Sequence, residues 1–183
     1  VVIATGAHER PLLFADNDRP GVMLASAARR YLWRYGVLAG RTPVIFGSDD
    51  TIYELAADLT AAGATVRAIV DLRPDPGAAA RRAEAAGLPT FAGAMVARAH
   101  GKRRVTAAEI WRLGPRPHLV ETMQADAILT AGGFGPTLQL HAQARGALLW
   151  DPDFRAFLPG PPVADNRSAG GARGVFDLQA AIR

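Results

Sequence analysis

Residues 43–71 read PVIFGSDDTIYELAADLTAAGATVRAIVD, and this stretch decides the fold. Val44–Phe46 is a short apolar run typical of a buried strand, and Gly47 interrupts it. Residues 48–50 (Ser-Asp-Asp) offer N-cap side chains for a helix over Thr51–Ala62, which carries leucines four positions apart. The stretch therefore begins as strand, tight turn and helix.

A second strand completes the pattern. Gly63 ends the helix, Ala64–Val70 is rich in apolar and β-branched residues, and Asp71 stands at its end. Strand, turn, helix and strand within about 30 residues form the opening half of a mononucleotide-binding unit.

The rest of the chain adds elements of both periods. Helical spacing predicts helices over Val22–Tyr35, over Ala78–Ala86, and from Val175 onward after a Gly-rich turn at 168–174. Apolar alternation and turn residues predict strands near Pro89–Gly93 and at Met95–His100, Arg104–Ile110, His118–Met123 and Ala127–Ala131. We therefore predict an α/β fold: a Rossmann-like three-layer domain with an antiparallel β-meander.

Two similar apolar runs end in glycine turns. VVIATG opens the chain, and AILTAGG ends at Gly133. A strand that turns sharply beside a bound cofactor needs glycine, because a Cβ there would obstruct the backbone or the ligand. Thr5, Gly6, Gly132 and Gly133 are therefore candidate cofactor-contacting residues.

With these turns bracketing the nucleotide pattern and the meander, the sequence resembles flavoproteins with two dinucleotide-binding domains, in which an NAD(P) domain is inserted into an FAD domain. It is most similar to the alpha subunits of heterotetrameric sarcosine oxidase and to related opine oxidase and hydrogen cyanide synthase subunits. The segments that carry this resemblance are ATGAHERPLLFADNDRPGVML at 4–24, RYGVLAGR at 34–41 and GGFGPTLQLHAQARGALLWDPDFRAFLPG at 132–160.

The resemblance implies a segment of a longer subunit. Residues 1–36 would be a trailing piece of the FAD-type domain with a linking helix, 37–123 the inserted NAD(P)-binding-like domain, and 124–183 the return segment of an incomplete FAD-type domain. Val1–Ala4 and Ala127–Ala131 would then both lie in the FAD-type sheet.

The resemblance also implies an activity for the intact complex. That complex would oxidatively demethylate sarcosine to glycine, with folate accepting the one-carbon unit and O2 the electrons. The expected partners are the other subunits of a hetero-oligomeric oxidase, and the amine-oxidising flavins would sit on a different subunit. We therefore expect no catalytic residue in this chain.

The phosphate turn departs from the glycine-rich pattern. A GxGxxG alignment places Gly47, Asp49 and Ile52 at the three glycine positions, so only the first glycine is present. With Ser48, these turn residues are candidate contacts for a diphosphate, yet the Asp49 charge would repel it by a few kcal/mol at about 4 Å. The alternative, which we favour, is that Asp49 turns outward to cap the helix.

Asp71 is better placed for a cofactor. It follows the turn by a spacing close to the roughly 20 residues expected of the acid that binds the adenosine ribose and disfavours a 2′-phosphate. The alternative is an ordinary aspartate in the strand-end turn DLRPDPG. The candidate cofactor is therefore NAD, while the nearby Arg73 leaves NADP open.

Composition narrows the remaining function classes. The net charge is +4, but the arginines are scattered, so we expect no nucleic-acid partner. Without cysteine the chain has no disulfide, no cysteine-ligated metal and no redox CxxC pair, and the four histidines share no metal-ligand spacing. No apolar run approaches the roughly 20 residues of a membrane span, and we expect a cytoplasmic protein.

Two alternatives stay open for the inserted domain. It either binds NAD or is a degenerate Rossmann-like scaffold for the assembly of subunits that no longer binds nucleotide.

Exposed strand edges in the flanks should favour self-association. We expect a dimer or disordered ends in solution, measured by light scattering. A strictly monomeric species with ordered termini would contradict this expectation.

Overall fold

The computed structural model describes residues 1–182 and divides into two compact units. Unit 1 contains Val1–Arg10 and the chain from Phe134 onward, and unit 2 contains Pro11–Gly133. The chain leaves unit 1 once and returns once, so unit 2 is an insertion in unit 1.

Unit 2 is built on a parallel five-stranded sheet. Its strand order is β3 (Val22–Leu24), β10 (Ala127–Ala131), β4 (Pro43–Gly47), β5 (Ala68–Asp71) and β6 (Thr90–Ala92). The central strands β10, β4 and β5 are buried throughout, as expected for a parallel sheet covered on both faces.

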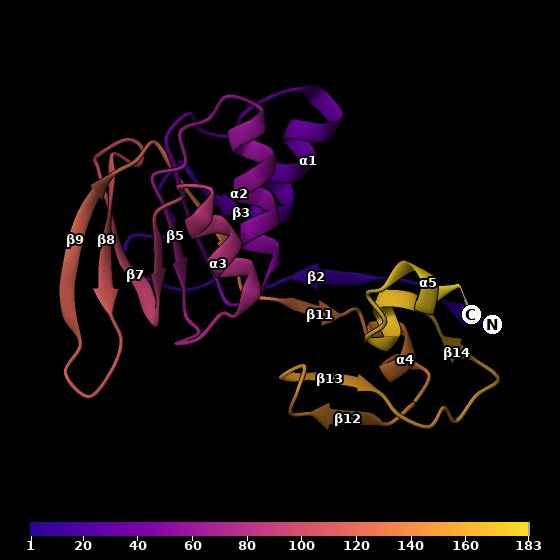
Figure 1. Cartoon of the computed structure of the whole chain (residues 1–183). Helices are drawn as coiled ribbons and strands as arrows, with labels where there is room; N and C mark the ends of the chain where they lie inside the picture. Colours follow the sequence, from indigo (N-terminus) through magenta and orange to yellow (C-terminus); the bar gives the residue numbers. More distant parts are fainter. Residues whose placement is uncertain (183) are drawn as a thin grey trace. The chain divides into compact units, whose positions relative to one another are not determined.

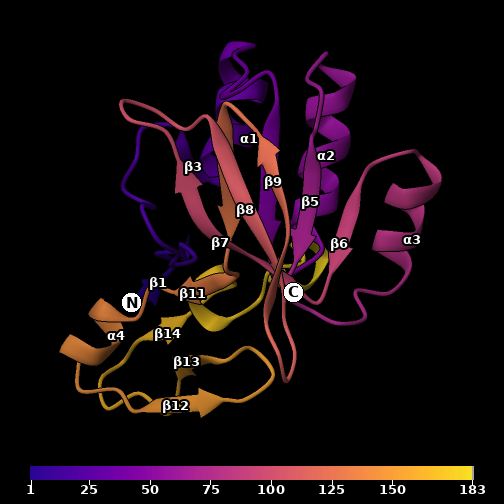
Figure 2. The same ribbon diagram turned by 90° about the vertical axis from the view of Figure 1, so that its left-hand side faces the viewer.

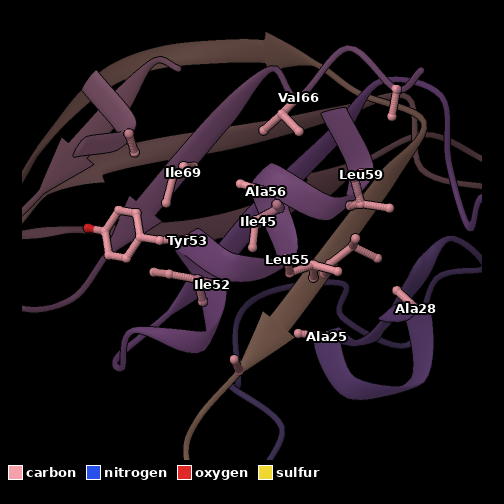
Figure 3. Close-up of a cluster of buried hydrophobic side chains, with 14 of the residues drawn as sticks. Ala25, Ala28, Ile45, Ile52, Tyr53, Leu55, Ala56, Leu59, Val66 and Ile69 are labelled. Carbon is pink, nitrogen blue, oxygen red and sulfur yellow. The ribbon is translucent and has the colours of Figure 1, made fainter. Parts of the chain in front are cut away.

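Apolar side chains alternate between the two faces of this sheet. Ile45, Ile69 and Leu129 pack into one buried cluster, whereas Val70 and Ile128 pack into another on the opposite face. Figure 3 shows the first cluster, in which side chains of one helix lie against Ile45 and Ile69.

Helices cover one face of the sheet and the meander covers the other (Figures 1 and 2). The helices are α1 (Ala25–Tyr35), α2 (Thr51–Ala61) and α3 (Ala78–Ala85). The antiparallel meander is β7 (Ala94–His100), β8 (Ala107–Arg112) and β9 (His118–Gln124). The predicted three-layer α/β fold with a β-meander is confirmed.

The sheet is wider than the sequence indicates. Val22–Leu24, predicted as the start of a helix, forms the edge strand β3, and α1 begins at Ala25. Ala127–Ala131, expected in the FAD-type sheet, instead pairs with β3 and β4 inside unit 2. The compact unit therefore extends beyond the 37–123 segment at both ends, because strand pairing joins the flanks to it.

Unit 1 consists of short elements. β1 (Val2–Ile3) pairs in parallel with β14 (Arg167–Ser168), and β2 (Ala7–Glu9) pairs in antiparallel with β11 (Phe134–Pro136). The remaining elements are α4 (Gln139–Gln143), the hairpin β12 (Leu148–Asp151) and β13 (Ala156–Pro159), the 3-10 turn η1 (Gly170–Arg173) and α5 (Leu178–Ala181). The helix predicted from Val175 onward is thus the single-turn α5 preceded by η1.

β2 and β11 are the segments by which the chain leaves and re-enters unit 1. Each follows one of the glycine turns, after Gly6 and after Gly133, and both of these glycines have positive φ (73° and 77°). Within the described residues, no helix is long and apolar enough to cross a membrane.

Asp126 joins the starts of β4 and β10. Its carboxylate accepts hydrogen bonds from the backbone N–H groups of Arg41 (2.7 Å) and Thr42 (2.9 Å). Burial alone would raise the pKa of Asp126, but these bonds outweigh it and hold the pKa below its ordinary value.

We expect Asp126→Asn to lower the free energy of unfolding at pH 7 by about 1–2 kcal/mol. Because the folded pKa is depressed, the wild type holds this stability above pH ~4 and loses it as the pH falls through the folded pKa. Urea unfolding between pH 2 and 7 should therefore show a smaller acid-dependent loss in the variant. Asp153→Asn, at an exposed side chain of unit 1, is the control, and equal pH slopes in wild type and Asp126→Asn would contradict the assignment.

Candidate functional site

The carboxyl ends of three parallel strands meet at one edge of unit 2. Gly47 at the end of β4 is in register with Asp71 at the end of β5 and with Ala131 at the end of β10. Ligands of open parallel sheets bind outside this edge, where the strand order reverses. The structure thus brings the predicted phosphate turn and the predicted ribose acid together.

Gly47 is required by packing. A Cβ at this position would lie 2.3 Å from Cγ2 of Ile52 and 2.9 Å from the Ala131 carbonyl oxygen. The backbone N–H of Ser48 donates to that same carbonyl (3.1 Å). The turn between β4 and α2 is therefore pressed against the end of β10, and one of its N–H groups is already used.

Asp49 points toward the start of α2. Its Oδ1 accepts hydrogen bonds from the backbone N–H of Thr51 (2.9 Å) and from the Thr51 hydroxyl. A helix N-terminus attracts anions because its first N–H groups lack partners inside the helix. The Asp49 carboxylate thus lies on an N–H group that a phosphate would need, which is the helix-directed placement.

Asp71 is fully buried, and both of its carboxylate oxygens are engaged. Oδ1 accepts from the backbone N–H of Arg73 (2.8 Å) and from its Nε (3.1 Å). Oδ2 accepts from Nη2 of Arg73 (2.8 Å) and from the hydroxyl of Tyr53 (2.9 Å). Four donors from two residues therefore satisfy this carboxylate.

Asp50 extends the network to the surface. Nη2 of Arg73 also contacts its Oδ1 at 2.8 Å, so the guanidinium bridges a buried and an exposed carboxylate. The hydrogen bond to Asp71 is the main cause that raises the pKa of Arg73 above its ordinary value. Burial, followed by the hydrogen bond to Asp71, raises the pKa of Tyr53 well above 10, so its hydroxyl remains a donor at neutral pH.

Sequence reasoning misses Tyr53 as a site residue. It lies in the first turn of α2 among apolar residues, where its ring reads as core, and the ring does pack in the helix-facing cluster. Figure 3 shows its hydroxyl pointing away from that cluster. A tyrosine three positions after Asp50 in such a helix was the available signal.

The edge in this arrangement does not fit a dinucleotide. A ribose hydroxyl would need a carboxylate oxygen of Asp71 that is exposed, and a diphosphate would need the helix N-terminus that Asp49 occupies. Binding therefore requires Arg73 and Asp49 to turn away from their present partners.

The other candidate turns lie elsewhere. Thr5 and Gly6 belong to unit 1, where the Thr5 hydroxyl donates to the Thr137 carbonyl (2.8 Å) and the Gly6 carbonyl accepts from the Thr137 N–H (2.9 Å). A Cβ on Gly171 would lie within 3.4 Å of Gly6 backbone atoms, so the η1 turn packs closely on this strand end. Gly132 and Gly133 follow β10 in unit 2.

Unit 1 also contains a hollow of about 810 Å³. His141 and Asn166 line it and are more than nine-tenths buried, and the His141 Nδ1 and both polar atoms of the Asn166 amide lack hydrogen-bond partners. The Thr5–Gly6 turn does not line it. Among residues 1–182, no cluster of three or more His, Cys, Asp or Glu side chains could hold a metal ion.

No protein-family model matches the sequence. Alpha subunits of sarcosine oxidase align along it: the one from Corynebacterium sp. (strain P-1) is 43% identical over 100% of this chain, and the one from Rhizobium meliloti (strain 1021) is 42% identical over 99%. This chain is a homologue of a segment of the sarcosine oxidase alpha subunit. It spans only 19% and 18% of the length of these two relatives.

A more distant relative matches part of the chain. The opine oxidase relative from Agrobacterium tumefaciens (strain Ach5), its A-type subunit, is 37% identical over 42% of this chain and 15% of its own length. The resemblance to both groups of subunits, predicted from the sequence motifs, is confirmed.

Solved structures show the same fold. Thioredoxin reductase from T. acidophilum superposes with a TM-score of 0.73 at 17% identity, over 99% of this chain and 60% of that chain. An FAD-dependent pyridine nucleotide-disulphide oxidoreductase from Desulfovibrio vulgaris gives a TM-score of 0.63 at 18% identity, over 92% of this chain and 44% of that chain. This homologue of the sarcosine oxidase alpha subunit therefore has the fold of this oxidoreductase class.

The packing of Gly47 gives a direct test of the closed turn. We expect Gly47→Ala to lower the free energy of unfolding by about 1–3 kcal/mol, because the new methyl group must displace Ile52 or the end of β10. The matched control is Gly135→Ala, where the nearest atom to the new Cβ is 3.9 Å away. Equal midpoints of urea unfolding for the two variants would contradict the packing role of Gly47.

Proposed function

We propose that this chain is part of the alpha subunit of a sarcosine oxidase-like complex in the cytoplasm. The intact complex would oxidise sarcosine to glycine, passing electrons to O2 and the one-carbon unit to folate. The support is the 43% identity that extends over the whole chain. In this proposal unit 2 is the inserted dinucleotide-binding-type domain, and unit 1 is part of the FAD-type domain.

Within that larger polypeptide, unit 2 acts as an assembly domain whose nucleotide edge is closed. The observation that carries this proposal is the fully buried carboxylate of Asp71, which has four protein donors. Opening the edge would break the contacts of the Arg73 guanidinium with Asp71 and with Asp50. Removing one partner of a buried ion pair costs about 3–5 kcal/mol, which a nucleotide would have to offset.

One observation favours a second candidate, NAD binding. Gly47 and Asp71 are register partners at adjacent strand ends, which is where a dinucleotide fold places its phosphate turn and ribose acid. If Arg73 turned outward, Asp71 would become available to a ribose and would disfavour a 2′-phosphate, so NAD would be preferred to NADP. Such a tightly held NAD would be structural, since the chain contains no cysteine pair for a disulfide relay.

Calorimetric titration with NAD, NADH and NADP separates the two candidates. For the assembly domain we expect no heat of binding with the wild type at millimolar nucleotide. Micromolar binding of NAD that is lost in Asp71→Asn would contradict the closed edge and establish the second candidate.

Arg73→Ala supplies the matched arm of this titration. In the NAD-binding case, removing the guanidinium uncovers Asp71, and the affinity for NAD should rise by about tenfold or more. In the assembly case, Arg73→Ala should remain silent toward nucleotide and should lower the free energy of unfolding by about 3 kcal/mol, because it leaves Asp71 buried without its ion-pair partner. Arg81→Ala, at an exposed position of α3, is the control for charge loss.

A further inference from the structure

α1 presents aromatic rings to solvent. Ala25 and Ala28 are buried and Leu32 packs against the core, so these residues form the inner side of the helix. On the outer side Trp33 is 68% exposed and Tyr35 is 61% exposed. Tyr31 is 47% exposed as well. Single exposed apolar residues are ordinary, but three aromatic residues within five positions of one helix mark an interaction surface.

Arginines separate these rings on the outer side. Arg30 and Arg34 are four residues apart and therefore adjacent on the helix surface. On one flank the rings of Tyr31 and Tyr35 lie 6.0 Å apart, and the Arg34 guanidinium lies 5.7 Å from the Tyr35 ring. The sequence-based impression of scattered arginines overlooks this RRYLWRY stretch, where arginine and aromatic residues alternate.

The other flank is held by a fixed contact. The Arg29 guanidinium lies 4.5 Å from the Trp33 ring centroid and pairs with Glu54 (2.9 Å) and Asp58 (2.7 Å) of α2. Two carboxylates and a ring therefore hold Arg29, which in turn supports Trp33 in its exposed position. A hollow of about 360 Å³ lies between Trp33 and the neighbouring arginines.

The outer side of α1 carries unbalanced positive charge. The helix contains no acidic residue, and Arg29 is neutralised by α2. Within the described part of the chain, no carboxylate pairs with Arg30 or Arg34. A partner that covers this side must bring its own carboxylates, because a buried unpaired arginine would be costly.

We propose that the face of α1 formed by Arg30, Tyr31, Trp33, Arg34 and Tyr35 docks onto a carboxylate-bearing surface of another protein subunit. This inference rests on the proposed function, for which it names the assembly surface. Tyr, Trp and Arg are the residues that dominate binding energy at protein interfaces. Figure 1 shows α1 at the end of the helical layer, beside α2 and with no helix on its other side.

The same features fit other macromolecules less well. Recruitment to anionic lipids takes clusters of four to eight basic residues, whereas this face has two unpaired arginines. Nucleic-acid affinity likewise grows with the number of phosphates neutralised. A protein surface needs only a few desolvated anchors, and the aromatic residues supply them.

Hydroxyl-radical footprinting of Trp33, Tyr31 and Tyr35 tests the proposal. The full-length subunit that carries this chain is oxidised by itself and after assembly with the other subunits of the oxidase. We expect all three rings to react in the isolated subunit, whereas in the complex they become at least about threefold less reactive. Protection already present in the isolated subunit would mean that its own chain covers the face, and would overturn the proposal.

Charge reversal supplies the second measurement. Arg30→Glu with Arg34→Glu should weaken binding of the partner subunits by at least about tenfold, whereas the matched pair Arg81→Glu with Arg82→Glu on α3 should leave it unchanged. Circular dichroism melting checks that both variants fold.

The remaining outcomes are distinct. A wild-type complex in which the rings stay reactive, or are protected only by added single-stranded RNA, would overturn the docking surface alone. Failure of the wild-type subunits to form any complex would overturn the proposed function and the docking surface with it.

Discussion

A carboxylate can be fully buried at the end of β5 only if donors replace the water that it loses, and this constraint organises the edge of unit 2. Asp71 obtains its donors from Tyr53 and Arg73. Tyr53 belongs to α2, so its hydroxyl ties the first turn of that helix to the neighbouring strand. Arg73 lies in the loop after β5, so its guanidinium fixes that loop and reaches Asp50 at the start of α2. The turn, the helix and the strand end are thus joined through one charged group.

The same constraint sets what the domain can do. A dinucleotide fold provides a ligand site where strand ends leave polar groups unsatisfied. Here those groups are satisfied from within: Asp71 by Arg73 and Tyr53, and the start of α2 by Asp49. The fold is that of pyridine nucleotide-disulphide oxidoreductases, while the edge is stabilised without a nucleotide. A domain retained under these conditions has its surfaces left for contact, and α1 exposes the residues suited to it.

Much of the fold follows from local signals in the sequence. Gly47, the polar residues after it and the leucine spacing of α2 predict strand, turn and helix correctly, because each signal acts within a few residues. Val22–Leu24 fails as a prediction because an apolar run that precedes a helix shares its period, and only pairing with the distant β10 makes it a strand. Ala127–Ala131 is correctly predicted as a strand, but its sheet depends on long-range pairing that composition does not encode.

The candidate site divides in the same way. The spacing from Gly47 to Asp71 places both residues correctly at one edge of the sheet, whereas the side chains that enclose Asp71 depend on packing across α2 and a loop. The most direct measurement is therefore the NMR signal of the Arg73 Nε–H, with and without millimolar NAD. The account predicts a solvent-protected signal that NAD leaves unchanged. A signal that exchanges rapidly with water, or that NAD displaces, would contradict it.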